Sequence, residues 1–189
     1  PSSRVLQNLD VEYLYEAPLA MEQEHLAQAA CECLHLPCPE PDLSDWEAMV
    51  NSLRHPTQEV NIALEGKYIQ LHDAYLSVVE ALKHGGIANS ATVNIKWVDS
   101  ELLTEDNVDS ILGDQDGILV PGGFGDRGVE GKITAIHYAR THKKPFLGLC
   151  LGMQMAIVEF ARHVAGLTGA HSVELNPQTI HPVIALMPD

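Results

Sequence analysis

The chain has 189 residues, of which 46% are hydrophobic and 20% are charged, and its formal net charge is −15. This composition is typical of a folded globular protein and excludes a disordered one. The acidic excess repels phosphate groups, so neither nucleic acid nor a membrane surface is an expected partner. No apolar run reaches the roughly 18 residues of a membrane span, and no signal-peptide pattern opens the chain, so we expect a cytoplasmic location.

Residues 1–56 have the pattern of two helices around a proline-rich break at 37–41. The first helix is expected over 21–36 and the second over 44–53, where Ser44 and Glu47 have the spacing of a capping box. Three of the four cysteines lie here, at Cys31, Cys33 and Cys38. A metal clip is the less favoured interpretation because no second Cys/His pair stands at zinc-ligand spacing, so we expect reduced thiols.

From residue 58 onward, strand and helix patterns alternate. Strands are expected at 60–64, 93–98, 117–120, 146–149 and 183–187, and helices at 73–82, 104–112, 129–140 and 151–165. The helix near 73 is expected to stop at Gly85-Gly86, and that near 104 to be capped by Thr104. This alternation predicts an α/β fold with a doubly wound parallel sheet, preceded by the short helical segment.

The run from Gly148 to Gly152 joins an apolar strand directly to an amphipathic helix, with Cys150 at its centre. A G-x-nucleophile-x-G turn exposes its central side chain at the carboxyl edge of a sheet. A thiol at a helix N-terminus faces unpaired N–H groups, which favours the thiolate. The sequence therefore predicts a nucleophilic cysteine, with a buried cysteine in a glycine-bearing strand as the alternative.

A second glycine-rich loop, at 121–128, also follows an apolar strand. It is not a nucleotide-binding P-loop, because Lys132 is followed by Ile133 instead of Ser or Thr. If its strand neighbours that of Cys150, its backbone N–H groups can supply half of an oxyanion hole for acyl transfer.

Together these motifs resemble a class I glutamine amidotransferase domain, which implies a flavodoxin-like fold. The strings "GKYIQLHDAYLSVVEALKHGG", "ILVPGGFGDRGVEGK" and "PFLGLCLGMQMAIVEFARHVAGL" resemble the CTP synthase family more closely. The upstream "LYEAPL" and "LPCPEPDLSDWEAMV" resemble the end of its synthetase domain and the interdomain linker. The resemblance implies that 1–56 are that tail and linker, and that 57–189 are a glutamine amidotransferase domain that stops before the triad His and Glu.

The resemblance also implies roles for five site residues. Cys150 would attack the side-chain amide of glutamine and form a thioester. Gly123 and Leu151 would donate backbone hydrogen bonds to the oxyanion. Glutamine itself would be held by Gly123, Gln154 and Glu174.

The resemblance implies further ligands, most of which would bind parts of the parent enzyme outside this chain. Arg127 and Glu130 fall in the stretch near which the activator GTP is expected to act. ATP and Mg²⁺ would serve the parent enzyme, which aminates UTP to CTP, and we expect no cofactor and no metal in this piece. The expected partners are glutamine and the synthetase domain, and the parent enzyme is expected to be a homotetramer.

One departure from the family concerns the base. The family completes its triad in a late H-x-E motif that this sequence does not contain, and His181 is better interpreted as the entrance to a strand. We therefore expect this piece to be inactive alone. Two kinds of alternative stay open: a cysteine hydrolase or chaperone of the intracellular-protease family or an amidotransferase of another pathway, and a catalytically dead binding or assembly module.

Overall fold

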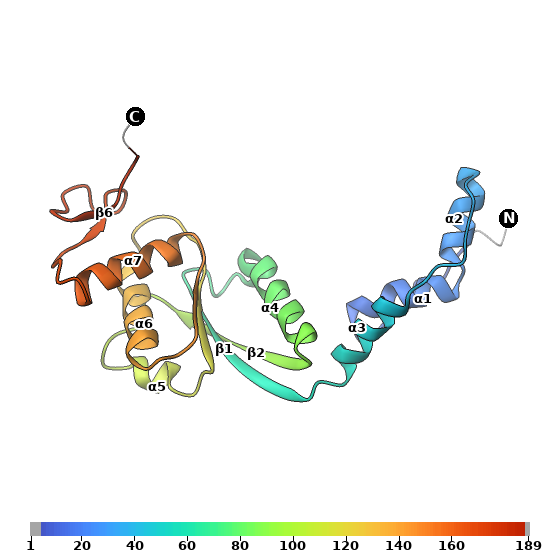
Figure 1. Ribbon diagram of the computed structural model, residues 1–189, viewed down its shortest axis with the longest axis horizontal. Coiled ribbons are helices and arrows are strands. Elements are labelled where there is room, and N and C mark those ends of the chain that lie inside the picture. The colour runs from blue at the N-terminus through green and yellow to red at the C-terminus, as the bar shows by residue number, and fades with distance from the viewer. Residues whose placement is uncertain (1–4, 188–189) are drawn as a thin grey trace. The chain divides into compact units, whose positions relative to one another are not determined.

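The computed structural model describes residues 5–187 and divides into two compact units (Figure 1). One unit holds the chain up to Thr57 together with Ile87–Ala91, and the other holds Gln58–Gly86 and the residues from Thr92 onward. The ends of the two predicted domains, residues 1–4 and 188–189, lie outside the described residues. Among the described residues, no helix has the length and apolar character needed to cross a membrane.

The first unit is helical. Its elements are η2 (Leu14–Glu16), α1 (Ala17–Gln23), α2 (Leu26–Leu34) and α3 (Ser44–Arg54). The single helix predicted over 21–36 is wrong, because His25 adopts a left-handed conformation with φ of 61° and separates α1 from α2. The predicted capping box is also wrong: Ser44 is already helical, and its N–H donates to Asp42 Oδ1 at 3.1 Å.

Two polar contacts tie α3 to the segment before α1. Arg54 Nε lies 2.6 Å from Glu16 Oε1, and the indole N–H of Trp46 donates to the Tyr15 carbonyl oxygen at 2.7 Å. Between them along the helix, Val50 is buried. These residues give the unit a small core of its own, built from one face of α3.

The second unit is an α/β fold. In chain order its elements are β1 (Gln58–Gly66), η3 (His72–Tyr75), α4 (Leu76–Ala88), β2 (Ala91–Asp99), α5 (Val108–Leu112), β3 (Gly117–Val120), α6 (Val129–Thr141), β4 (Phe146–Gly148) and α7 (Leu151–His163); only the last two residues of α4 and the first of β2 belong to the other unit. The sheet has the order β2-β1-β3-β4, with β3 parallel to both β1 and β4. The predicted doubly wound parallel sheet is confirmed.

Side chains on the two faces of the sheet enter different cores. Ala63, Ile118 and Val120 pack with residues of α5, α6 and α7. Their neighbours Leu64 and Leu119 pack with residues of η3 and α4. This alternation follows from the two-residue period of a strand, and it places α4 and the α5–α7 group on opposite faces (Figure 1).

Two predicted helix ends differ from the structure. The helix of α4 continues through Gly85 and Gly86, neither of which has the positive φ of a glycine cap; the first such residue after it is Ser90, with φ of 51°. The helix predicted from Thr104 begins only at Val108. Asn107 is its N-cap, and its side-chain Oδ1 accepts a bond from the Thr104 N–H, so 104–107 form a turn instead.

The last predicted strand does not join the main sheet. β6 (Pro182–Ile184) pairs in parallel with β5 (His171–Ser172) in a separate two-stranded sheet. The strand predicted at 183–187 is observed at Pro182–Ile184, so it begins one residue earlier and ends three residues earlier than predicted. It does not belong to the doubly wound sheet to which the sequence assigned it.

A charged pair is buried within the α/β unit. The side chains of Glu65, on β1, and Lys132, on α6, are 0% and 2% exposed, and their nearest N and O atoms are 3.8 Å apart. That separation is too long for a hydrogen bond. Burial raises the pKa of Glu65 to about 7, although the Lys132 charge opposes the rise. Burial also lowers the pKa of Lys132.

We predict that Glu65 makes the fold less stable as the pH rises. Its pKa is higher in the folded state than the ordinary value of 4.5, so unfolding releases a proton between pH 4.5 and about 7. Stability should fall through this window and level off above it, by about 3 kcal/mol at about 1.4 kcal/mol per pKa unit. Because glutamine does not ionise, the stability of Glu65→Gln should not fall in this window. Its advantage in unfolding free energy over the unmodified protein should therefore grow by about 3 kcal/mol between pH 5 and pH 8.

Urea unfolding at the two pH values measures this difference. Exposed Glu105 supplies the control, because Glu105→Gln should leave the pH dependence unchanged. The prediction is wrong if Glu65→Gln and the unmodified protein lose the same stability between pH 5 and pH 8.

Candidate active site

The segments that follow β1, β3 and β4 meet at one edge of the sheet, because these three strands run parallel. Cys150 follows β4, the glycine-rich loop follows β3, and Lys67 follows β1. Lys67 Nζ donates to the Phe124 carbonyl oxygen at 2.8 Å, so the end of β1 holds the glycine-rich loop directly. The prediction that the two motif-bearing strands are neighbours is confirmed by the pairing of β3 with β4.

Cys150 lies at the corner between β4 and α7. It is exposed and is the N-cap residue of α7, with φ of 51° and ψ of −107°. Such a backbone conformation is sparsely populated and costs about 1–3 kcal/mol, so the surroundings must impose it. Two hydrogen bonds hold the corner: Leu149 N–H donates to the Val120 carbonyl oxygen, and Gly152 N–H to the Leu149 carbonyl oxygen, each at 2.9 Å.

The two glycines of the corner are required by close backbone contacts. A Cβ on Gly148 would lie 2.6 Å from the backbone carbon of Gly152. A Cβ on Gly152 would overlap the carbonyl oxygen of Val120. The first turn of α7 can therefore approach the ends of β4 and β3 only because Gly148 and Gly152, respectively, lack a side chain.

The glycine-rich loop lies against the cysteine corner. A Cβ built on Gly122 would be 3.4 Å from the Cys150 Cβ, and one built on Gly123 would be 3.8 Å from Leu151 Cδ2. The N–H of Leu151 belongs to the first turn of α7, where N–H groups lack an intrahelical acceptor. The structure thus brings Gly123, Cys150 and Leu151 together, while their roles in an oxyanion hole stay predictions.

The two residues predicted to hold glutamine lie in different segments. Gln154 is half-buried in the first turn of α7, where its N–H donates to the Cys150 carbonyl oxygen at 3.1 Å. Glu174 is exposed in the turn after β5, and its N–H donates to Ser172 Oγ at 3.3 Å. Gln154 is therefore placed beside the cysteine by the helix itself, whereas the position of Glu174 depends on the small second sheet.

The residues predicted near the GTP activator both form ion pairs. Arg127 Nε lies 2.8 Å from Glu101 Oε1, and Glu130 Oε2 lies 2.9 Å from Arg162 Nη1. The Arg127 and Glu130 side chains are 52% and 71% exposed, so each is accessible to a ligand as well as to its partner. Their role towards GTP stays a prediction.

His181 has the structural position predicted for it, and the other three cysteines are free thiols. His181 directly precedes β6, and its carbonyl oxygen accepts a bond from the His171 N–H, as a residue entering a paired strand does. Cys31, Cys33 and Cys38 are free thiols, the last two exposed. Although Cys38 is exposed, partial desolvation of its thiol and the neighbouring Cys31 raise its pKa.

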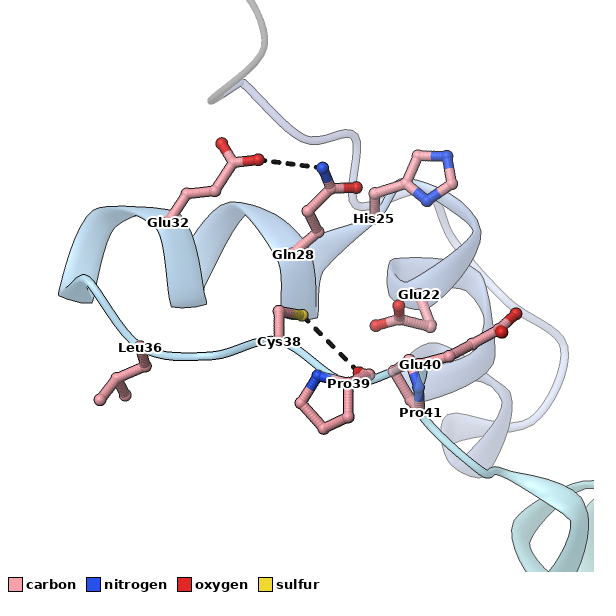
Figure 2. Close-up of a pocket in the computed structure, with 9 residues that line it drawn as sticks. All are labelled: Glu22, His25, Gln28, Glu32, Leu36, Cys38, Pro39, Glu40 and Pro41. Carbon is pink, nitrogen blue, oxygen red and sulfur yellow. Dashed lines mark hydrogen bonds between the residues drawn. The ribbon is translucent and has the colours of Figure 1, made fainter.

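The helical unit contains a large hollow that has none of the predicted site residues. It measures about 590 Å³, and Figure 2 shows its lining side chains along α2 and along the segment 36–41 that includes Cys38. Three glutamates, Glu22, Glu32 and Glu40, contribute to this lining. The chemistry at Cys150 therefore does not coincide with this concave surface, and size alone does not identify the site.

Lys67 is the site residue that the sequence analysis missed. Its signal was present, since a lysine directly after an apolar strand stands at the same sheet edge as the glycine-rich loop and Cys150. Its partner was not foreseeable, because the acceptor is a backbone carbonyl oxygen 57 positions along the chain.

Comparison with known proteins agrees with this geometry. The family model "Glutamine amidotransferase class-I" matches residues 70–182. The CTP synthase of Clostridium acetobutylicum is 60% identical over 98% of this chain, and that of Ruminiclostridium cellulolyticum is 58% identical over all of it. In both cases the chain covers 35% of the relative, about a third of its length.

A solved structure shares the fold. It is described as "Trypanosoma brucei CTPS - glutaminase domain with bound acivicin" and is 43% identical, with a TM-score of 0.65. The match covers 68% of this chain and 50% of that one.

We predict that Gly152→Ala destabilises the α/β unit, because the new methyl group would overlap the Val120 carbonyl oxygen. Overpacking of this kind costs about 1–3 kcal/mol. The matched control is Gly85→Ala in α4, where an added Cβ meets no atom within 4 Å. In a helix interior that change should stabilise by up to about 1 kcal/mol. Urea unfolding of both variants tests the prediction, which is wrong if Gly152→Ala is as stable as the unmodified protein.

Proposed function

The chain belongs to the class I glutamine amidotransferase family, and on that premise we propose that Cys150 is the nucleophile that hydrolyses the side-chain amide of glutamine. One observation carries the proposal: Cys150 is exposed at the strained N-cap of α7, with Gly122 beside it and Gly123 beside the next residue, Leu151. A nucleophile in this position has N–H groups of two separate segments close to the carbonyl that it attacks.

The reaction proceeds through a thioester. The thiol of Cys150 gives its proton to a base, and the sulfur bonds to the amide carbon. The tetrahedral oxyanion is stabilised by the N–H groups of Gly123 and Leu151. Its collapse breaks the C–N bond, and the departing nitrogen takes a proton and leaves as ammonia. Water then attacks the thioester, which releases glutamate and restores the thiol.

The remaining groups would bind glutamine and transfer protons during the reaction. Gln154, one turn along α7 from Cys150, is suited to hold the amino-acid end of glutamine, with Glu174 as the second contact. The proton transfers require a histidine and glutamate of the family's late H-x-E motif. His181 is not assigned this role, because it stands at the entrance to β6 in the separate sheet.

For the whole protein we propose the CTP synthase reaction, in which ammonia from glutamine aminates UTP that ATP has activated. The support is the identity of 60% with a CTP synthase over nearly the whole chain. ATP and Mg²⁺ are assigned to the synthetase domain, because the loop after β3 lacks the Lys-Ser/Thr pair of a P-loop. GTP as activator near Arg127 and Glu130, a homotetramer and a cytoplasmic location belong to the same proposal.

The protease-like alternative has a specific requirement that can be checked. Its members place a glutamate in hydrogen-bond contact with the cysteine. Within residues 5–187, no glutamate side chain is hydrogen-bonded to Cys150. This observation favours the amidotransferase over a hydrolase of that kind.

The site can be tested with a chloroketone analogue of glutamine, which alkylates a thiol placed beside the bound substrate. We expect it to label Cys150 before Cys31, Cys33 or Cys38, and excess glutamine to slow that labelling alone. Iodoacetamide, which has no glutamine-like part, is the control reagent, and peptide mass spectrometry locates the label. Equal labelling of the four thiols, or no protection by glutamine, would contradict the assignment of Cys150.

The whole reaction requires a test in the full-length protein. We expect Cys150→Ser to lower glutamine-dependent CTP formation by about 10⁴-fold or more, while CTP formation from added ammonia continues. For the isolated 189-residue chain we expect negligible ammonia release, since losing acid–base assistance costs about 10²–10⁴-fold in rate. Rapid release by that chain would assign the base to one of its own histidines, with His181 tested first by substitution with alanine.

A further inference from the structure

Three side chains that commonly bind metals converge where α6 packs beside α7. His137 comes from α6, and Glu159 and His163 come from α7, four positions apart and so on one face of the helix. One ligand atom from each lies within 4.8 Å of the other two. We propose that His137, Glu159 and His163 bind a divalent transition-metal ion of the zinc type, which links the two helices.

The distances suit a single ion. His137 Nδ1 lies 2.8 Å and His163 Nδ1 lies 3.3 Å from the same carboxylate oxygen, Glu159 Oε1. Two ligand atoms at tetrahedral positions around one zinc ion, with bonds of about 2.1 Å, are about 3.4 Å apart. The two N–O distances are close to that value and all three ligand atoms lie within 4.8 Å of one another, so small rotations of the two rings would let them share one ion.

Glu159 Oε1 is crowded by polar neighbours. His137 Nδ1 and Arg140 Nη2 each lie 2.8 Å from it and Arg140 Nε lies 3.1 Å away, while Oε2 accepts from Arg140 Nε at 2.9 Å. His163 Nδ1 bonds instead to the Glu159 backbone carbonyl oxygen at 3.1 Å. A carboxylate offers about four acceptor positions over both oxygens, so the donors at Oε1 compete. One ion beside Oε1 would replace the His137 contact there, and each imidazole would bind the ion through the nitrogen lone pair of its other tautomer, with His163 giving up its bond to the Glu159 carbonyl oxygen.

Burial divides the site into a fixed and an open side. The Glu159 side chain is 1% exposed, whereas those of His137 and His163 are 41% and 38% exposed. The carboxylate is thus held in place before the ion arrives, and water can occupy the remaining coordination positions.

Arg140 has two opposite effects. Its bond to Oε2 orients the carboxylate, as a hydrogen-bonding partner of a metal ligand commonly does. Its positive charge repels an incoming cation. The proposed site should therefore bind the metal ion more weakly than the same site without Arg140. Substitution of Arg140 is expected to strengthen metal binding, whereas substitution of a ligand is expected to weaken it.

The ligand set selects the class of metal. Imidazole with carboxylate suits zinc, cobalt, nickel and copper ions, whereas Mg²⁺ and Ca²⁺ prefer sites made of oxygen alone. The proposal departs from our expectation that this chain holds no metal. The Glu159–His163 spacing is visible in the sequence, but His137 joins it only through the packing of α6 on α7.

Calorimetric titration with Zn²⁺ tests the site in protein whose four thiols have been alkylated, because free cysteines also bind zinc. We expect one ion per chain. His137→Ala and His163→Ala should each weaken binding by about tenfold or more, the effect usual for loss of a group that supports a metal. Arg140→Gln should strengthen it. His142→Ala is the control, since that ring stacks on Tyr138 and bonds to the Tyr138 carbonyl oxygen.

A measurement on the unsubstituted protein covers the case in which a variant fails to fold. In long-range ¹H–¹⁵N spectra, Zn²⁺ should shift the ring nitrogens of His137 and His163 and leave those of His142 unchanged. If Zn²⁺ does not bind, or shifts none of these rings, the cluster is an ion-pair network only and the proposal is overturned. Equal Zn²⁺ affinity in every variant overturns it as well.

Discussion

The geometry of the candidate site depends on the contact between Gly152 and the carbonyl oxygen of Val120. That oxygen lies at the end of β3, where it accepts the N–H of Leu149, and the first turn of α7 passes too close to it for any side chain at position 152. The main-chain direction therefore has to reverse within about three residues. Cys150 occupies the middle of that reversal, and its unusual φ and ψ follow from the constraint on both sides.

The order of the sheet explains why three separate segments meet at this corner. Residues of α4 pack on one face of β1 and β3 and those of α6 and α7 on the other, so the chain leaves neighbouring strands in opposite directions. In such doubly wound sheets the carboxyl ends at the change of direction are not covered by a connecting helix. The glycine-rich loop and Lys67 occupy that position, and the Lys67–Phe124 bond holds them together.

The sequence was sufficient to predict the features that depend on local chemistry. The apolar runs gave the sheet strands, and the glycines around Cys150 gave the corner, because a turn this tight has few solutions. Helix ends were less predictable: Gly85-Gly86 has the composition of a helix stop, but no tertiary contact requires a left-handed residue there, and α4 continues. Clusters such as Glu65 with Lys132 were not predictable, since their members are 67 positions apart and have no motif.

The orientation of α7 is fixed at two points along its length, and this bears on the chemistry proposed at Cys150. At its N-terminus the Gly152–Val120 contact sets the distance to β3, and two turns later Glu159 is bound by Arg140 and His137 of α6. A helix held at one end only can tilt about that point. With the second attachment, the N–H groups of its first turn keep a fixed direction relative to the glycine-rich loop, which is what stabilisation of an oxyanion requires, since donors that must first reorient lose their advantage. The polar cluster of α6 and α7 thus supports the position of the corner at Cys150 without being part of it.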